Sequence, residues 1–460
     1  MIGGGLAGLS SAVALAEAGI RVRLLEQRPY LGGRASSYAL PGGEHVDNCQ
    51  HVTLGCCTNL EDFYRRVGAG DKITFYDRLV FVGTDGSRSV MEASALPPPL
   101  HLAPSLILYP SLTWAERRSI GQAMLAIVRR GGRNTGGDAA GVSMLDWLRK
   151  HGQSPAAISR FWGVVLVSAL DEDLDRIDAR YGLDVFWKSF LANRAGYRVG
   201  VPSVPLSDLY EGCRVAIEHR GGEVALRAAV RGLRVADGRI TGVQMDGERE
   251  ETADLYLLAV PHDAVLELLP RELIENEPLF GNLRRLRVSP ITGVHFWFDR
   301  NVMSEPFLTL LDRTTQWIFN KSRLYGGPGD GQYLQLVISA SYDLVRRSRQ
   351  EIIDLCLGEL LQVLPEAQGA KLLKATVIKE TAATFSPEPG SDRWRPSQST
   401  PLPNLFLAGD WTATGWPATM EGAVRRGYLA AEAILNSVGE PRKIVRPDLP
   451  SEGIARLLTR

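Results

Sequence analysis

A glycine-rich turn within the first eight residues constrains the fold of this chain more than any other feature. Gly3, Gly5 and Gly8 have the spacing of a dinucleotide-binding turn, and a helical pattern runs from Leu9 to Ala18. In such a turn the first glycine permits a tight bend, the second leaves room for a pyrophosphate, and the third lets the helix pack closely. The helix N-terminus offers free N–H groups and partial positive charge to the phosphates. Glu26 then ends a short strand, where a carboxylate can accept hydrogen bonds from a ribose diol.

Two further motifs favour FAD over NAD, which the glycine turn alone leaves open. A second glycine motif, Gly32-Gly33-Arg34, directly follows Glu26, where a nicotinamide enzyme has no need of one. Near the other end, an apolar strand from Asn404 leads into a Gly-Asp turn and then into a helix from about Thr419. The positive end of that helix would face the flavin ring and favour its reduced anion. The residues that we expect to bind FAD are Gly3, Gly5, Leu6, Ala7, Gly8, Glu26, Gln27, Arg28, Gly33, Arg34, Val230, Ala259, Gly409, Asp410, Thr419, Met420 and Ala423.

The position of these motifs at both ends predicts an α/β fold with a discontinuous Rossmann-type FAD-binding domain and an inserted α+β substrate domain. We expect the FAD-binding domain to comprise residues 1–90, 200–262 and 395–437, including a strand at 221–230 that supplies a buried Val230. The substrate domain would comprise residues 91–199 and 263–394, with a helix from Thr113 to Arg130 and a strand from Thr292 to Phe298. Residues 438–460 are expected to form a peripheral tail.

Composition agrees with a soluble, cytoplasmic enzyme. Lys plus Arg and Asp plus Glu both number 52, and this lack of a basic excess argues against nucleic acid as a partner. The five cysteines lack metal-ligand spacing, so we expect free thiols and no metal site. There is no signal-peptide pattern and no apolar run of the length that spans a bilayer. Only Met1 and Ile2 precede the glycine turn, which is short for a central strand, so we expect the natural chain to start slightly upstream.

The segment from Ala95 to Trp114 is unusually apolar, but its prolines forbid a continuous helix. One interpretation is a buried part of the substrate domain. The other is a surface that touches the inner face of the membrane and admits a lipid.

Several of these motifs resemble the amine-oxidase and carotenoid-desaturase superfamily of flavoproteins. The resemblance lies in the opening glycine turn, in Gly32-Gly33-Arg34, and in the Leu-Ala-Gly-Asp-Trp-Thr stretch at 407–412. Within that superfamily, Asp-Asn-Cys-Gln-His-Val at 47–52 and Thr-Gly-Trp-Pro-Ala-Thr-Met-Glu-Gly-Ala-Val at 414–424 resemble the squalene-associated FAD-dependent desaturases, also described as hydroxysqualene dehydroxylases. Cys49 stands where their pattern has glycine.

The resemblance implies reductive dehydroxylation of hydroxysqualene, a C30 isoprenoid, to squalene in hopanoid biosynthesis, with reduced FAD as the hydride donor. It also implies transient contact with the preceding enzymes of the squalene pathway. Three alternatives remain open at this point: a desaturase or isomerase of a carotenoid-like polyene, an amine oxidase, and a flavin-bearing scaffold that presents a lipid to a partner.

The candidate catalytic residues are His51, Asp47 and Trp416. His51 would protonate the departing hydroxyl, or else cap a loop, and Asp47 would orient His51 or cap a turn. Trp416, together with Trp411, would shield a substrate carbocation with its ring face, or pack against the cofactor. Trp317 is a weaker candidate for the substrate tunnel, and Arg34 would pair with a phosphate or with the protein.

Overall fold

A parallel sheet assembled from four distant parts of the chain forms the centre of the cofactor-binding half. The computed structural model describes residues 1–40, 43, 45–132, 139–326 and 331–458. Strand β1 (Arg23–Leu25) pairs in parallel with β9 (Glu223–Ala225), and β13 (Tyr256–Leu258) pairs in parallel with β19 (Leu405–Leu407). Ile2 joins the two pairs because it bridges Leu25 on one side and Leu258 on the other. The predicted α/β fold is thereby confirmed, and the first strand is reduced to Ile2 with its two bridges.

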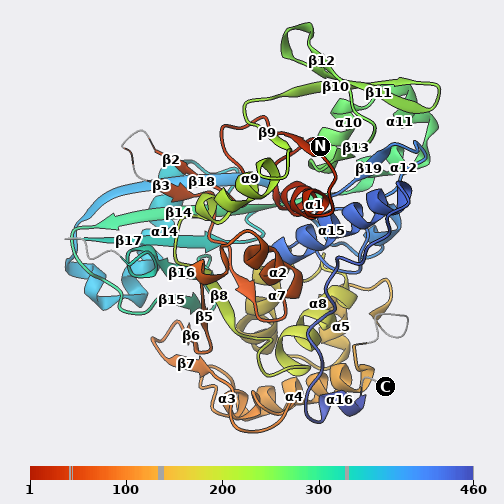
Figure 1. Cartoon of the computed structure of the whole chain (residues 1–460). Helices are drawn as coiled ribbons and strands as arrows, with labels where there is room; N and C mark the ends of the chain where they lie inside the picture. The colour runs from red at the N-terminus through yellow and green to blue at the C-terminus, as the bar shows by residue number, and fades with distance from the viewer. Residues whose placement is uncertain (41–42, 44, 133–138, 327–330, 459–460) are drawn as a thin grey trace.

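Two helices pack on this sheet from opposite ends of the sequence (Figure 1). They are α1 (Leu6–Glu17), which begins three residues before the predicted start, and α15 (Met420–Ser437). A Cβ on Gly427 of α15 would lie 2.3 Å from Ala7 O, so the missing side chain lets the helices touch. Thr419 caps α15 as a good N-cap residue should, because its hydroxyl accepts a hydrogen bond from Gly422 N at 3.0 Å.

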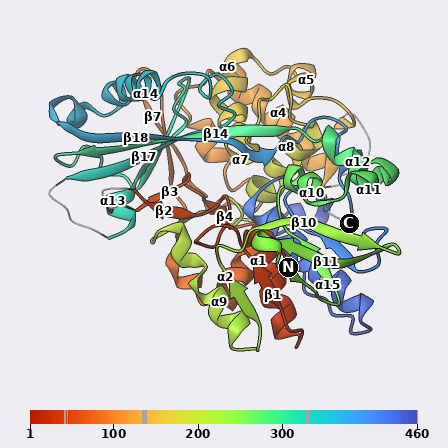
Figure 2. The same ribbon diagram turned by 90° about the horizontal axis from the view of Figure 1, so that it is seen from above.

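The substrate half is organised around a seven-stranded sheet, which lies beside the cofactor-binding half in Figures 1 and 2. Its strand order is β18 (Leu372–Phe385), β14 (Val288–Phe298), β17 (Gln332–Ile338), β16 (Trp317–Asn320), β15 (Phe307–Leu310), β6 (Leu79–Val82) and β7 (Arg88–Met91). Helix α14 (Arg349–Val363) packs against β14 and β18. The domain boundary expected at residue 90 falls inside β7, and strand pairing places β6 and β7 in the sheet of the substrate half.

Helices form the remainder of the substrate half (Figure 2). They are α3 (Ala103–Ile107), α4 (Trp114–Arg130), α5 (Met144–Lys150), α6 (Pro155–Ala157), α7 (Val164–Leu170) and α8 (Ala179–Val185). Thr113 and Glu116 form a reciprocal capping box at the start of α4, where the sequence predicts a helix. No helix in the described ranges is long and apolar enough to cross a membrane.

The remaining strands and helices complete the described part of the chain. The strands are β2 (Ser37–Ala39), β3 (His45–Asp47), β4 (Thr53–Leu54), β5 (Ile73–Tyr76), β8 (Val199–Pro202), β10 (Val230–Ala236), β11 (Arg239–Met245) and β12 (Glu250–Glu251). The helices are α2 (Thr58–Arg66), α9 (Glu211–Glu218), α10 (His262–Leu268), α11 (Arg271–Asn276), α12 (Pro278–Gly281) and α13 (Lys321–Leu324). Val230 begins β10 and is half-buried, which corrects the expectation that it ends a strand as a buried residue.

The tail after residue 438 lies on the surface and is held by contacts along its length. Ile444 is buried, and Arg446 Nε donates to Asp62 of α2 at 2.9 Å. Helix α16 (Ala455–Leu458) follows, and Ala455 N donates to Pro98 O at 3.1 Å. The tail therefore spans from the cofactor-binding half to the apolar 95–114 segment. Its last two residues, 459–460, lie outside the described part.

The contact between Gly8 and Gly3 generates a prediction about stability. A Cβ on Gly8 would lie 2.0 Å from the backbone oxygen of Gly3, so Gly8→Ala must displace backbone. We expect this substitution to destabilise the protein by about 1–3 kcal/mol, as overpacking does, and to lower the thermal unfolding midpoint. Gly121→Ala in α4 is the matched control, because its Cβ would meet nothing within 4 Å. The thermal unfolding midpoint of Gly121→Ala should equal or exceed that of the wild type. A wild-type midpoint for Gly8→Ala would contradict the predicted clash with the backbone of Gly3.

Candidate active site

One large cavity, of ≈ 480 Å³, gathers both glycine motifs and the Gly-Asp turn; we call it the dinucleotide cavity. Every residue that the sequence proposes for FAD binding lines it except Gly8. Gly8 instead lies against the backbone of Gly3, where it allows the close approach of α1. The residues nominated from three distant parts of the sequence thus share one space.

The N-terminal wall of the dinucleotide cavity has the features that a pyrophosphate requires. Gly5 is the N-cap of α1 and supplies no side-chain cap, so the first N–H groups of the helix remain available. A Cβ on Gly5 would meet only Gly33 Cα, at 3.9 Å, so any side chain here would take up cavity space. The two glycine motifs are joined directly, because Gly32 N donates to Gly4 O at 2.9 Å.

Glu26 is buried in the same wall and organises its backbone. Its two carboxylate oxygens accept hydrogen bonds from Gly4 N and Arg28 N, each at 2.7 Å. Each carboxylate oxygen has a second lone pair, which leaves acceptor capacity for a ribose diol. These features fit an adenine dinucleotide.

Arg34 and Asp410 form an ion pair that closes the other side of the cavity. Arg34 Nη2 lies 2.8 Å from Asp410 Oδ1, and Arg34 Nη1 donates to Ala383 O at 2.7 Å. Burial would raise the pKa of Asp410, but the Arg34 charge and hydrogen bond outweigh it and hold that pKa below its ordinary value. Two partners were expected for Arg34, a phosphate or the protein. In the structure its guanidinium is bound by the protein, at Asp410 and Ala383.

A second cavity, of ≈ 220 Å³, adjoins the first and is lined mainly by apolar side chains; we call it the apolar cavity. Its wall includes Leu54, Leu79, Phe81, Met91, Val165, Phe190 and Trp317. Eight residues line both cavities, namely Gln50, Val52, Ser168, Ala169, Val337, Ser339, Thr419 and Met420. We call this group the junction. Because Thr419 caps α15, the positive end of that helix lies at the junction.

The 47–52 segment, which the sequence singled out, reaches the junction through Gln50 and Val52. A buried ion pair anchors it: Lys321 Nζ lies 2.6 Å from Asp47 Oδ2 and 2.5 Å from Gln50 Oε1. Ser37 and Tyr325 also donate to the Asp47 carboxylate, at 2.6 and 2.7 Å. Burial alone would raise the pKa of Asp47, but Lys321 and these hydroxyls lower it. Asp47 therefore serves the anchor, and these contacts do not orient His51.

His51 lines the dinucleotide cavity and is held by its own loop. Its Nδ1–H donates to Cys49 O at 2.9 Å, which leaves Nε2 as a hydrogen-bond acceptor. Burial lowers the pKa of His51 below its ordinary value. A neutral imidazole with this tautomer is better suited to accept a proton than to donate one, so the geometry favours a base over the expected acid.

The tryptophans near the Gly-Asp turn are not placed to shield a substrate cation. Trp416 lines the apolar cavity, but Lys188 Nζ and Arg425 Cζ already lie 4.6 and 4.4 Å from its ring centroid. A further cation there would meet like charge. Trp411 is fully buried in the core, and its Nε1–H donates to Val260 O at 2.9 Å. Trp317 does line the apolar cavity and donates to Ser168 Oγ at 2.7 Å.

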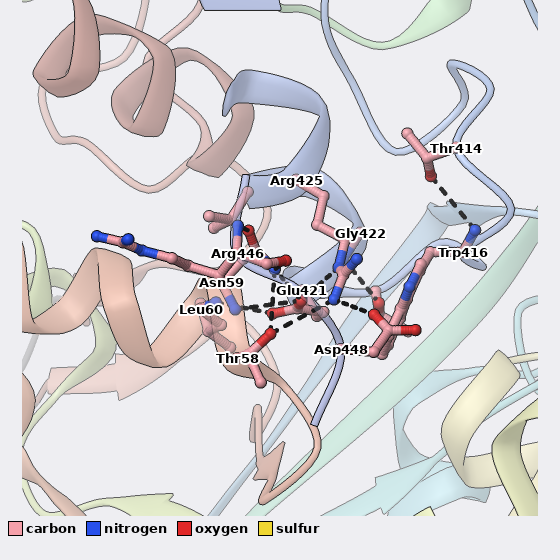
Figure 3. A network of polar contacts seen from close by, with 12 residues as sticks. Thr58, Asn59, Leu60, Thr414, Trp416, Glu421, Gly422, Arg425, Arg446 and Asp448 are labelled. Atoms are coloured by element: carbon pink, nitrogen blue, oxygen red, sulfur yellow. Dashed lines mark hydrogen bonds and ion pairs between the residues drawn. The ribbon is translucent and has the colours of Figure 1, made fainter. Parts of the chain in front are cut away.

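A buried network beneath the junction fixes the start of α15 (Figure 3). The Glu421 carboxylate accepts from Leu60 N at 2.7 Å and from Arg425 Nε at 2.6 Å, and it also accepts from Asn59. Arg425 is also paired with Asp448 of the tail, at 2.5 Å. The network thus joins α2, α15 and the tail, and it holds the helix end that faces the junction.

The sequence analysis missed the junction residues Gln50, Ser168 and Ser339, and also the buried acid Asp171, which lines the dinucleotide cavity. The available signal was the end of the apolar 164–170 run, where Asp171 follows directly. An acid at the end of a buried helix in an apolar domain is costly unless it has a function or a partner.

The fold and the two cavities define a flavin-dependent oxidoreductase, and solved structures share that fold. An oxidoreductase from Methanosarcina mazei superposes with a TM-score of 0.73 at 18% identity, covering 95% of this chain and 99% of that one. A putrescine oxidase superposes with a TM-score of 0.72 at 16% identity, covering 95% and 98%.

The family model "Flavin containing amine oxidoreductase" matches residues 6–435, so the chain belongs to that family and FAD is its cofactor. The chain is 28% identical to a 15-cis-phytoene desaturase of Synechococcus elongatus, covering 94% of both proteins. It is also 28% identical to a zeta-carotene desaturase of a Synechocystis species, covering 95% of this chain and 96% of that protein.

The position of Glu26 leads to a prediction about cofactor affinity. Glu26→Ala removes an acceptor for the ribose and releases the backbone of Gly4 and Arg28. Loss of hydrogen bonds to a charged group costs about 1.5–3 kcal/mol, so FAD binding to the apoprotein should weaken by about 10–100-fold. Titration followed by flavin fluorescence measures this affinity. Glu26→Gln keeps one acceptor, so its FAD affinity should lie between those of the wild type and Glu26→Ala. Wild-type FAD affinity in Glu26→Ala would refute the role of Glu26 in binding the ribose.

Proposed function

We propose that this protein is an FAD-dependent oxidoreductase of long isoprenoid chains that reduces hydroxysqualene to squalene. The observation that carries this proposal is the apolar cavity, which meets the dinucleotide cavity at the junction. A hydrocarbon chain gains about 0.8 kcal/mol for each CH₂ group that it buries, so a C30 chain suits such a wall. The resemblance of the 47–52 and 414–424 segments to hydroxysqualene dehydroxylases supports the particular substrate.

The proposed reaction replaces a hydroxyl group by hydrogen at an allylic carbon. Reduced FAD, when bound, supplies hydride. The chain's own residues must bind the apolar ends of the substrate, exclude water and deliver a proton to the departing oxygen. The apolar wall serves the first two tasks. The junction also carries four polar side chains, Gln50, Ser168, Ser339 and Thr419, and Gln50 and Ser168 are already hydrogen-bonded within the protein, so the Ser339 hydroxyl is the group proposed to bind the substrate hydroxyl.

Polyene desaturation is the second candidate, and two observations favour it. The relatives reported above carry desaturase names. The neutral His51, with Nε2 as acceptor, suits removal of a proton from a substrate that loses hydride to the flavin. Oxidation of a charged amine is a poorer fit, because the wall of the apolar cavity would desolvate an ammonium group.

The direction of the reaction generates a prediction. When the photoreduced enzyme is mixed with hydroxysqualene without oxygen, the absorbance of oxidised flavin should return in step with squalene formation. Stopped-flow absorbance and gas chromatography follow the two signals. The control is squalene itself, which should leave the reduced flavin unchanged.

A polyene desaturase would behave in the opposite way. In that case a carotenoid precursor such as phytoene would bleach the oxidised enzyme, and hydroxysqualene would not reoxidise the reduced one. This outcome would contradict the dehydroxylase proposal and establish the alternative.

We also propose that the protein collects its substrate from the cytoplasmic surface of a membrane, beside the enzymes that supply it. Apolar side chains of the 95–114 segment and of the tail are exposed rather than buried, and we call them the apolar belt. They are Leu96, Leu100, Ile107, Leu108, Trp114, Ile454 and Leu457. Figure 1 shows α3, α4 and α16 together at one end of the molecule.

Two contacts support the proposal that the apolar belt binds a lipid surface. Arg117 lies 4.7 Å from the Trp114 ring, a basic and aromatic pair typical of the lipid headgroup region. Tyr197, which lines the apolar cavity, accepts a hydrogen bond from Ala93 N at 2.9 Å. The 95–114 part of the apolar belt therefore directly follows Ala93, which contacts the wall of the apolar cavity at Tyr197.

The belt predicts a change in activity that depends on how the substrate is presented. The double variant Leu108→Glu and Leu457→Glu, at side chains that are 77% and 65% exposed, should weaken binding to liposomes and slow turnover of liposome-borne substrate. FAD content should stay at the wild-type level, because neither side chain lines the dinucleotide cavity. Leu373→Glu, at an exposed leucine of β18, is the matched control and should bind liposomes normally. Undiminished flotation of the double variant with liposomes would contradict the proposal.

A further inference from the structure

The acid Asp171 stands beside the junction without any role in the sites described so far. It directly follows α7 and lines the dinucleotide cavity, with 4% of its surface exposed. Ser168 and Ala169, within the preceding turn of the helix, line both cavities. The carboxyl group is therefore within one helical turn of the place where substrate and flavin meet.

The backbone at Asp171 is held in an unusual conformation. Its φ of +51° lies in the left-handed region, and its Oδ1 accepts a hydrogen bond from Ala340 N at 2.9 Å. Ala340 is itself left-handed, with a φ of +49°. Left-handed residues other than glycine are costly, and they persist at functional sites where the surroundings enforce them. Here two such residues, Asp171 and Ala340, are joined by a hydrogen bond.

The surroundings of Asp171 favour the neutral acid. Burial raises its pKa well above the ordinary value, Glu172 adds to the rise, and the hydrogen bonds from Ala340 and Thr384 and the Arg34 charge only oppose it in part. The two charged neighbours of Asp171 each have a partner of opposite charge: Glu172 is paired with Arg176 at 3.5 Å, and Arg34 is paired with Asp410. Neither pair therefore supplies a counter-charge dedicated to Asp171. Oδ1 accepts from the backbone N–H of Ala340, which can only donate, whereas the Thr384 hydroxyl that donates to Oδ2 at 3.0 Å can also accept, so the proton belongs on Oδ2.

We propose that Asp171 is the catalytic acid that protonates the departing hydroxyl group; this inference rests on the proposed dehydroxylation. The Oδ2–H bond breaks as the proton joins the substrate oxygen. The C–O bond breaks with its electron pair on that oxygen, and water leaves. Hydride from the reduced flavin then forms the new C–H bond, so the carbon is reduced and the flavin is oxidised by two electrons. Asp171 is left as a carboxylate and recovers its proton from solvent before the next turnover.

The test compares Asp171→Asn with the wild type and with Glu172→Gln. Asparagine also tolerates the left-handed region and has the same size, but it has no acidic proton. Reoxidation of the reduced enzyme by hydroxysqualene should slow by about 10²–10⁴-fold, the usual contribution of a general acid, while FAD content stays normal. Glu172→Gln alters an equally buried neighbour that is bonded to Ser386 and Tyr342, and it should slow reoxidation less than tenfold. His51→Ala should slow reoxidation by less than Asp171→Asn does. A larger effect of His51→Ala would indicate that His51, and not Asp171, is the acid.

Infrared spectroscopy of the holoprotein gives a second readout that does not depend on turnover. At neutral pH the difference spectrum between wild type and Asp171→Asn should contain the C=O stretch of a protonated carboxyl group. Thr384→Val should shift this band, because Thr384 is hydrogen-bonded to Oδ2, and this variant tests the assignment even if Asp171→Asn fails to fold.

The outcomes separate this inference from the proposed function. If hydroxysqualene reoxidises the wild type and Asp171→Asn equally fast, or if neither variant alters a carboxyl band, Asp171 is not the acid although the dehydroxylase proposal stands. If hydroxysqualene does not reoxidise the wild type, both proposals fail together.

Discussion

The buried ion pair between Lys321 and Asp47 is the interaction on which the arrangement of the active site depends. It joins Asp47, the last residue of β3, to Lys321, the first residue of α13, across 274 positions of the chain. Both side chains are almost fully buried, so neither charge is solvated and loss of either partner would leave the other uncompensated. Lys321 also binds Gln50; Gln50 and Val52 line both cavities, and His51 between them lines the dinucleotide cavity. The pair therefore fixes where a substrate can approach the flavin.

The contrast between the two cavities fits the proposed hydride transfer between a flavin and a hydrocarbon chain. The dinucleotide cavity is bounded by backbone N–H groups, Glu26 and the Arg34–Asp410 pair, all of which suit a charged cofactor. The apolar cavity offers leucine, valine and aromatic side chains, so little competes with burial of an apolar chain. Polar groups concentrate at and beside the junction, and there the chemistry is decided by which group holds a proton. Asp171 is suited to donate one and His51 to accept one.

Local signals in the sequence predicted the cofactor half well. The glycine turn and the Thr419 cap each depend on residues within one or two turns of the chain, and the capping box at Thr113 and Glu116 is equally local. The Lys321–Asp47 pair was not predictable in this way, because its partners lie 274 positions apart in the sequence and meet only in the tertiary structure. Distance in the sequence also hid Lys188 from the interpretation of Trp416, and Ala340 and Thr384 from any interpretation of Asp171. A pattern identifies residue types suited to a reaction, but the tertiary partners decide their protonation and role.

The central claim is that a flavin ring and an isoprenoid chain meet at the junction of the two cavities. A crystal structure of the FAD-bound protein with squalene, the product of the proposed reaction, tests this claim most directly. We expect density for the ring beside Gln50, Ser339 and Thr419, and density for the hydrocarbon along Leu54, Phe81 and Phe190 in the apolar cavity. Squalene bound away from the flavin, or a ring located at the Glu26 end of the dinucleotide cavity, would contradict it.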